Sequence, residues 1–248
     1  MSTWFGYQEV RPEDKSKLVR RVFSSVADRY DLMNDLMSVG VHRLWKAAMI
    51  DWLAPRSGLH LLDVAGGTGD IAFRVQDRVG ARGGAADIVV ADINPAMLEV
   101  GRDRALDQGR LSGLAWVCMD AEDLALPDRT FDAYTIAFGI RNVTRIERAL
   151  VEARRVLKPG GRFLCLEFSA LRAEALQPLY DAYSFTVLPW LGERVAGDRP
   201  AYQYLAESIR RFPDQAAFAS MIEEAGFENV RVRNLSGGIA ALHSGWRL

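Results

Sequence analysis

The middle of the chain alternates short, continuous apolar runs with longer amphipathic segments. We expect strands at the run that leads up to Asp63 and at 87–92, 114–119, 131–138 and 162–168. Runs of this length without polar interruption are typical of strands buried on both faces. The segments between them have helical apolar spacing, as over 146–157. Strands that alternate with helices predict a parallel sheet with helices on both faces.

Two helices are expected before this region. Apolar residues recur at helical spacing from Pro12 to about Tyr30 and again from about Val41 to Leu53. The stretch between them is polar and breaks the period. Residues 1–11 contain aromatic side chains but no period, so we expect a loose lead-in there.

The pattern changes again after the fifth expected strand. Residues 173–212 are rich in tyrosine and contain three prolines, which predicts helical pieces inserted before the sheet is completed. A helix is expected over 214–225, closed by Gly226. Strands over 228–234 and 239–246 then form a hairpin, so the sheet should end with an antiparallel strand.

A chain of 248 residues can form one large α/β domain or two small ones, and we favour one. Within that domain we assign 1–53 to an N-terminal helical cap and 54–170 to the ligand-binding core. Residues 171–213 form a helical insertion for the substrate, and 214–248 form the C-terminal helix and hairpin.

Charge and cysteine content narrow the classes of function. The chain has 31 basic and 32 acidic residues, so its net charge gives no indication of nucleic-acid binding. Cys118 and Cys165 lie in strand-like runs, and no cysteine or histidine cluster predicts a metal site. No segment has the pattern of a signal peptide or the roughly 18 uncharged apolar residues of a membrane span. We therefore expect a cytoplasmic protein that is not integral to a membrane.

The turn after the first expected strand carries a chemical signal. Asp63 is followed by Gly66, Gly67 and Gly69, and then by an amphipathic segment. Glycines let the backbone approach a ligand closely, and free N–H groups at a helix start favour an electron-rich partner. The spacing differs from the dinucleotide fingerprint G-x-G-x-x-G. An ordinary tight turn between strand and helix is the alternative.

Polar residues also follow the other expected strands, at the sheet edge where doubly wound folds bind ligands. The carboxylate of Asp92 can accept hydrogen bonds from both hydroxyls of a ribose. Asp120 can accept from the amino group of an adenine, while the backbone N–H of Ala121 reads a ring nitrogen. Each acid taken singly could equally be a helix N-cap. Together they predict a nucleoside site.

Several motifs together resemble one enzyme family. They are Tyr-Asp-Leu-Met-Asn (30–34), Leu-Leu-Asp-Val-Ala-Gly-Gly-Thr-Gly-Asp (61–70), Phe-Gly-Ile-Arg-Asn-Val (138–143) and Leu-Glu-Phe-Ser (166–169). The glycine motif resembles the first motif of class I S-adenosylmethionine (SAM) methyltransferases. The set resembles the UbiE/MenG/COQ5 family of quinone-ring C-methyltransferases, from about residue 15 to the C-terminus. This implies a Rossmann-like fold with a mostly parallel seven-stranded sheet, an antiparallel last strand and helices on both faces.

The resemblance implies SAM-dependent C-methylation of a polyprenylated hydroquinone, either demethylmenaquinol or 2-polyprenyl-6-methoxy-1,4-benzoquinol. Thr68 and the glycine N–H groups are then expected at the aminoacyl portion of SAM. The other expected cofactor residues are Asp63, Gly66, Gly67, Gly69, Asp92, Asp120 and Ala121. Ala137 stands where the family often has serine, so only a backbone contact is expected there. Tyr30 covers the cofactor if the N-terminal helices cap the sheet, and lies in a plain interhelical turn if they do not.

The chemistry requires an electron-rich ring. A hydroquinone becomes a strong carbon nucleophile when its phenol, with a pKa of about 10, loses its proton. We expect Arg141 and Asn142 to position the ring and stabilise the developing phenolate. Because arginine stays protonated, the proton should pass to Asp31, His42 or water. The alternatives are that Arg141 pairs with a nearby acid and that His42 is a packing residue.

Partners and rival functions follow from the same motifs. Aromatic residues of 180–190 either line a channel for a prenyl tail or belong to the core. A substrate that lies in the bilayer favours transient contact with the inner membrane, and other quinone-biosynthesis enzymes or a second copy are further candidate partners.

The rival functions are a SAM methyltransferase for a soluble small molecule, a nucleotide-dependent dehydrogenase, and a non-catalytic scaffold of a quinone-synthesis complex.

Overall fold

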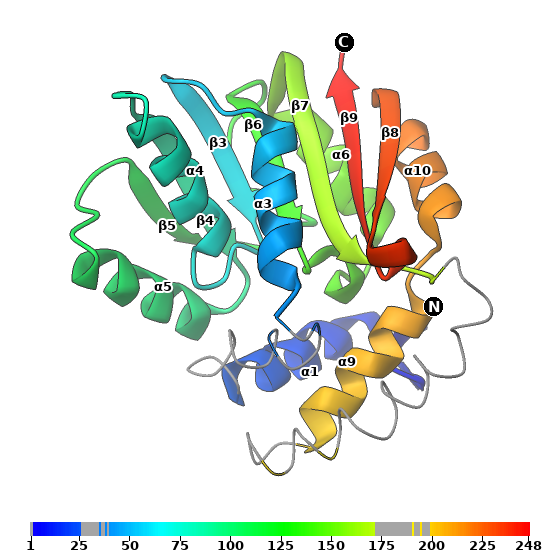
Figure 1. Ribbon diagram of the computed structural model, residues 1–248. Coiled ribbons are helices and arrows are strands. Elements are labelled where there is room, and N and C mark those ends of the chain that lie inside the picture. The colour runs from blue at the N-terminus through cyan, green and yellow to red at the C-terminus, as the bar shows by residue number, and fades with distance from the viewer. Residues whose placement is uncertain are drawn as a thin grey trace.

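The computed structural model describes residues 2–25, 35, 38, 40–171, 190, 194 and 199–248. Its centre is a seven-stranded sheet with the order β5-β4-β3-β6-β7-β9-β8 (Figure 1). The strands are β3 (Leu59–Val64), β4 (Ala86–Asp92), β5 (Leu114–Cys118), β6 (Phe131–Ala137), β7 (Leu157–Phe168), β8 (Glu228–Leu235) and β9 (Ala240–Arg247). β9 is antiparallel to both of its neighbours, β7 and β8, and the other four pairs of strands in this sheet are parallel. The predicted mostly parallel sheet with an antiparallel last strand is confirmed.

Helices cover both faces of the sheet, and each face has its own apolar core. One core joins β3 and β7 to α3 (His42–Leu53) and α4 (Asp70–Gly80). The other joins β6 and β7 to α6 (Ile146–Val156) and α10 (Gln215–Glu224). Figure 1 shows α3 and α4 in front of the sheet and α6 behind it. The central strands are therefore buried on both sides, as their uninterrupted apolar runs predict.

Two expectations about boundaries change, and a third is tested only in part. Residues 1–11 are not a loose lead-in, because β1 (Thr3–Phe5) and β2 (Gln8–Val10) form an antiparallel hairpin. These strands are too short to show an alternating pattern. The fifth strand begins at Leu157, before its expected start at residue 162. Its register with β6 skips from Phe131↔Leu157 to Ala133↔Arg162. The expected helix from Pro12 is described as α1 (Pro12–Ser25), and residues 26–30 lie outside the described residues.

The N-terminal elements lie at the carboxyl ends of the parallel strands. Figure 1 shows α1 and α9 (Arg199–Arg211) beneath the ends of β3 and β7. The ring of Phe5 on the hairpin stacks on Tyr204 of α9, with centroids 4.1 Å apart. At this edge the described part of the predicted cap is α1 with the hairpin, and α9 from the predicted insertion packs beside them, whereas α3, also assigned to the cap, packs on a face of the sheet. Most of the predicted insertion before α9 lies outside the described residues, and the domain boundaries stay a prediction.

The turn between β3 and α4 depends on glycine. Gly69 caps α4 with a φ of 81°, in the left-handed region that favours glycine. A Cβ built there would lie 2.6 Å from Cη2 of Trp116, which comes from β5. The turn therefore packs against the edge of the sheet as closely as a residue without a side chain allows.

We expect Gly69→Ala to lower the free energy of unfolding by about 2 kcal/mol, because a Cβ adds left-handed strain and displaces the Trp116 ring. Gly80→Ala is the matched control, since a Cβ at Gly80, the last residue of the same helix, meets nothing within 4 Å. That variant should be as stable as the wild type or up to about 1 kcal/mol more stable. Urea unfolding measures both variants, and equal stabilities would contradict the expectation.

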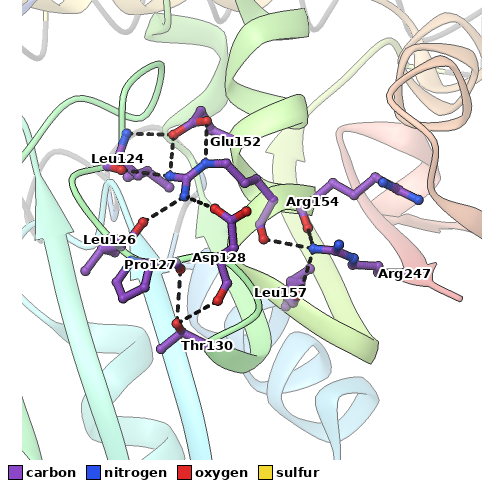
Figure 2. Close-up of polar contacts among 10 residues, drawn as sticks. Leu124, Leu126, Pro127, Asp128, Thr130, Glu152, Arg154, Leu157 and Arg247 are labelled. Atoms are coloured by element: carbon purple, nitrogen blue, oxygen red, sulfur yellow. Dashed lines mark hydrogen bonds and ion pairs between the residues drawn. The ribbon is translucent and has the colours of Figure 1, made fainter.

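The loop after β5 is held by one arginine of α6. Arg155 donates to the carbonyl oxygens of Leu124 and Leu126, at 2.8 and 2.7 Å, and to the carboxylates of Asp128 and Glu152 (Figure 2). These acids raise the pKa of Arg155 further above its ordinary value. Glu152 in turn accepts from the backbone N–H of Leu124. The network holds residues 124–128, which follow Asp120 and Ala121 in the same loop, against α6.

Three further elements complete the described chain. The helix α5 (Pro95–Asp107) begins at Asn94, whose side chain accepts from the N–H of Ala96. Single 3₁₀ turns, η2 (Ile140–Asn142) and η6 (Ser236–Gly238), follow β6 and precede β9. Among the helices of the described ranges, none is long and apolar enough to cross a membrane.

Candidate active site

A hollow of about 770 Å³, partly open to solvent, lies between α1 and the carboxyl ends of β3 to β6. We call it the large hollow. Val19 and Phe23 of α1 form one wall, and the loops that follow the strands form the other. Five of the predicted site residues line it: Gly67, Asp92, Asp120, Ala121 and Asn142. Residues that are up to 75 positions apart in the chain, from Gly67 to Asn142, therefore line one cavity.

α1 is tied over the large hollow near both of its ends. Nζ of Lys15 is buried and donates to the carbonyl oxygen of Val143 at 2.9 Å. Burial lowers the pKa of Lys15 to about 8, although the charge of Glu122 acts in the opposite direction. The side-chain amide of Asn94 donates to Oγ of Ser24 at 3.1 Å and to the carbonyl of Arg20. These contacts hold α1 over the cavity, which it lines with Ser16, Val19, Arg20 and Phe23.

Asp92 ends β4 with its carboxylate aimed at the glycine turn. Oδ2 accepts from the N–H of Gly67 at 3.0 Å, and Oδ1 accepts from the N–H of Asn94 at 2.8 Å. Burial raises the pKa of Asp92 to about 6, and the backbone hydrogen bonds limit that rise. A carboxylate has about four acceptor positions, so two remain for the hydroxyls of a ribose.

The loop after β5 brings Asp120 and Ala121 to the same cavity. Oδ1 of Asp120 accepts from the N–H of Glu122 at 2.9 Å, which shapes a tight turn. Glu122 accepts from the N–H groups of Thr144 and Arg145, both at 3.0 Å. The loops after β5 and β6 are therefore joined, and the surface that would meet an adenine is fixed in place.

Four more of the predicted cofactor residues line a second hollow, which we call the small hollow and which has about 340 Å³ of empty space, open solvent included. Asp63, Gly66, Thr68 and Ala137 line it, together with Lys46, Asp70 and Ile71. Ala65, which follows β3, and Phe138, which follows β6, line both hollows, so the two cavities are neighbours. Oγ1 of Thr68 accepts from Arg104 at 3.0 Å and can still donate its own proton.

The two hollows fit the two ends of SAM. Oδ2 of Asp63 is a buried acceptor without a hydrogen-bond partner among the described residues, as expected where a ligand amine is to bind. A Cβ on Gly66 would lie 2.9 Å from that oxygen, so the absent side chain leaves the approach open. A nucleoside fits the acceptors of the large hollow and an amino acid those of the small one. Gly69, which lines neither hollow, supports the turn between them.

Arg141 and Asn142 point to different surroundings. Nη1 of Arg141 lies 2.6 Å from Oε1 of Glu167 and 2.7 Å from the carbonyl oxygen of Phe138. Both charged side chains are almost fully buried, at 2% and 1% exposure. Burial raises the pKa of Glu167, and the arginine opposes that rise. Asn142 lines the large hollow, and its Oδ1 accepts from the Tyr204 hydroxyl at 2.9 Å. The two expected catalytic neighbours are thus separated, with the arginine in a buried ion pair.

His42 lies at the start of α3, where its Nε2 is 2.8 Å from Oδ1 of Asp35. Burial and the charge of Lys46 lower the pKa of His42, against the effect of Asp35. It lines neither hollow. Tyr30 and Asp31 lie outside the described residues, and their roles stay predictions.

Lys46 is the site residue that the sequence reasoning missed. It lies on α3 three, four and seven residues before Met49, Ile50 and Leu53, all of which are buried. A lysine on the apolar stripe of a predicted helix is a signal, because charged groups are buried only with a partner. Here the partner is Asp70, whose Oδ2 lies 2.7 Å from Nζ.

The fold and the paired hollows define a Rossmann-like methyltransferase that uses SAM. A solved SAM-dependent methyltransferase from Aquifex aeolicus has the same fold, with a TM-score of 0.63 and 16% identity, over 91% of this chain and 98% of that one. The model of the ubiE/COQ5 methyltransferase family matches residues 10–247. This chain belongs to that family.

Two curated relatives match nearly the whole chain. One from Paracoccus denitrificans (strain Pd 1222), a ubiquinone/menaquinone biosynthesis C-methyltransferase, is 62% identical over 99% of this chain and 97% of its own length. One from Oryza sativa subsp. japonica, a mitochondrial 2-methoxy-6-polyprenyl-1,4-benzoquinol methylase, is 58% identical over 100% of this chain and 89% of its own. The family and cofactor expected from the motifs are confirmed.

Proposed function

We propose that this protein transfers a methyl group from SAM to a ring carbon of a polyprenylated hydroquinone in ubiquinone or menaquinone biosynthesis. The observation that carries the proposal is the large hollow itself, where acceptors for a nucleoside and the amide of Asn142 share one cavity under α1. The names of the two relatives support the choice of acceptor.

The residues of the chain bind and align the reactants. SAM supplies a methyl group that its sulfonium already activates. Asp92 and Asp120 hold the nucleoside under α1. Alignment of the reactants supplies much of the rate, because reacting atoms held in line need no further ordering.

Removal of the proton from the phenol is the remaining step. We assign the developing phenolate to the amide of Asn142 in the large hollow. Arg141, which is buried in its ion pair with Glu167, positions this loop and does not contact the ring. Because His42 lines neither hollow, we favour Asp31 or water as the acceptor of the proton.

Methyl transfer from labelled SAM to two reduced quinols, demethylmenaquinol and 2-polyprenyl-6-methoxy-1,4-benzoquinol, tests the proposal. The wild type should label at least one quinol, and Asp92→Ala and Arg141→Ala should label neither. Arg141→Ala should still bind SAM, since Arg141 does not line the large hollow. SAM binding without label in either quinol would overturn the proposal and favour a soluble acceptor or a scaffold.

We also propose transient contact of the β1–β2 hairpin with the membrane that holds the quinol. Trp4 and Tyr7 are 42% and 51% exposed, and the guanidinium of Arg211 lies 3.4 Å from the centroid of the Trp4 ring. Aromatic rings beside a cation are typical of side chains at a membrane surface. We also propose that the protein is located in the cytoplasm.

Trp4→Ser combined with Tyr7→Ser should reduce sedimentation with vesicles of mixed neutral and anionic lipid about tenfold, while SAM affinity stays unchanged. Exposed Leu111, which lies before β5, gives the matched control Leu111→Ser. Equal sedimentation of the double variant and the wild type would exclude the hairpin as the contact.

A further inference from the structure

We propose that β8 is a docking strand for an extended acidic segment of a partner protein, which pairs with the free edge of the sheet and brings carboxylates to the arginines on one face of that edge. The inference goes beyond the proposed function and is independent of the cofactor and of the quinol. It rests on a group of five side chains that we call the arginine face: Trp52, Arg162, Arg231, Arg233 and Trp246.

The register of the last three strands assembles the arginine face. Arg162 of β7 pairs with Trp246 of β9, and Arg231 of β8 pairs with Ser244, two residues before Trp246. Paired residues, and residues two apart in one strand, lie on the same face of a sheet, so Arg233 shares this face with Arg231. In Figure 1 it is the face on which α3 lies, and no helix of the described ranges lies in front of β8 and β9 there.

Two tryptophans hold the guanidinium groups in place. The guanidinium carbon of Arg162 lies 5.2 Å from the ring centroid of Trp52, on α3, and 5.0 Å from that of Trp246. The guanidinium carbon of Arg233 lies 4.9 Å from the Trp52 centroid. Nε of Arg162 also donates to Oγ of Ser244 at 2.9 Å. These contacts orient the arginines, but a ring or a hydroxyl has no net negative charge, so the positive charges stay uncompensated.

The three arginines lack an acidic partner. Among the described residues, none of Arg162, Arg231 and Arg233 forms an ion pair with a carboxylate. Burial, and next the charges of Arg233 and Arg231, lower the pKa of Arg162 below its ordinary value. One acid, Glu228, pairs with Trp246 and so shares the face, but it makes no ion pair with the arginines. Positive charge is therefore in excess, and like charges in one patch repel each other until an acid from elsewhere joins them.

β8 also offers a backbone edge. It is the last strand of the sheet and pairs only with β9, so its outer row of N–H and C=O groups has no neighbouring strand among the described residues. Exposed edges of this kind can bind an extended segment as an added strand. Alternate residues of a strand are about 7 Å apart, which is the interval between Arg231 and Arg233. Acids at every second position of an added strand therefore meet both arginines, and opposite charges on neighbouring strands stabilise the pairing.

The surroundings favour a protein segment over a nucleic acid or a lipid surface. The chain has a net charge of −1, so no broad basic field surrounds the arginine face. Its tryptophan rings already stack on arginines, which takes up ring faces that bases would need. Figure 1 shows the end of β9 and the last turn of α3 at the opposite end of the sheet from α1. A membrane at the β1–β2 hairpin would therefore not reach them, and a partner docked there leaves the large hollow accessible.

Fluorescence anisotropy with labelled peptides and the full chain tests the proposal. The probe peptide alternates glutamate with valine. One reference peptide has lysine in place of each glutamate, and the other has proline in place of each valine. The probe should bind at least tenfold more tightly than either reference, because lysine reverses the charge and proline removes the N–H groups that a paired strand needs.

Arg231→Gln combined with Arg233→Gln should weaken binding of the probe peptide at least tenfold, while the circular dichroism spectrum stays unchanged. Arg82→Gln combined with Arg102→Gln is the matched control, because it removes two exposed arginines outside the arginine face and changes the net charge equally. Arg231→Glu combined with Arg233→Glu should shift the preference at least tenfold toward the lysine peptide, a gain that a misfolded variant could not show.

Equal binding of the probe by the wild type and by the double glutamine variant of β8 would overturn the inference. Equal binding of the valine and proline peptides would overturn it as well, since charge attraction alone would then explain the affinity. Tighter binding of a short single-stranded DNA than of the probe, lost in the same variant, would replace the protein partner by a nucleic acid. These outcomes leave the proposed function untouched, because the arginine face lines neither hollow.

Discussion

Replacing Glu167 by glutamine should lower the free energy of unfolding by about 3–5 kcal/mol, the cost of leaving one charge of a buried pair without its partner. Arg141 would keep its positive charge in a site where its side chain is 2% exposed. The ring of Phe168, 5.5 Å from the guanidinium carbon, cannot replace the carboxylate. Urea unfolding followed by circular dichroism measures the change.

The matched control is Asp51→Asn, which breaks the ion pair with Arg78 at the surface. Its side chains are 62% and 37% exposed, so the expected change is below about 1 kcal/mol. Arg141→Met combined with Glu167→Met should recover part of the loss, because an apolar pair leaves no charge uncompensated. A loss below 1 kcal/mol in Glu167→Gln would show that water reaches the pair and that the site is more open than its burial indicates.

Asp92→Ala should weaken SAM binding by at least 100-fold. Two hydrogen bonds from ribose hydroxyls to a carboxylate contribute about 1.5–3 kcal/mol each, and each 1.4 kcal/mol corresponds to a factor of ten. Asp87→Ala is the control, because Asp87 lies on the same strand, is exposed and lines neither hollow. Calorimetry gives both dissociation constants, and a change below tenfold in Asp92→Ala would remove Asp92 from the ribose site.

The same residue should make SAM binding depend on pH. The pKa of Asp92 is raised to about 6, so its carboxylate loses its charge as the pH falls through 6. Ribose hydroxyls bind the charged form better, and the affinity advantage of the wild type over Asp92→Asn should shrink about tenfold between pH 7 and pH 5. Because Asp63 titrates in both proteins, this comparison isolates Asp92. A constant ratio would mean that Asp92 stays charged at pH 5.

The sequence predicted the elements whose pattern is local. Strands buried on both faces give uninterrupted apolar runs, so β3 and β4 were placed correctly. Glycines in a turn indicate that backbone or side chains approach closely, so the turn at Gly69 was placed correctly too. The hairpin of three-residue strands was missed because a pattern of period two needs more residues to be seen.

The arrangement of the site could be predicted only in part. Parallel strands bring their carboxyl ends together, which explains why Asp92 and Asp120 line one cavity as expected. The direction of each side chain is not visible in the order of residues. Gly67 and Thr68 are adjacent in the chain yet line different hollows, and Arg141 turns away from Asn142 toward Glu167, 26 residues further on.

The order of the last three strands sets the order in which the sheet can assemble. β9 follows β8 in the chain but lies between β7 and β8, and it pairs with both. β8 therefore has no strand to pair with until β9 has been synthesised and has docked on β7. During translation, this part of the sheet should stay unformed until the whole of β9 has left the ribosome.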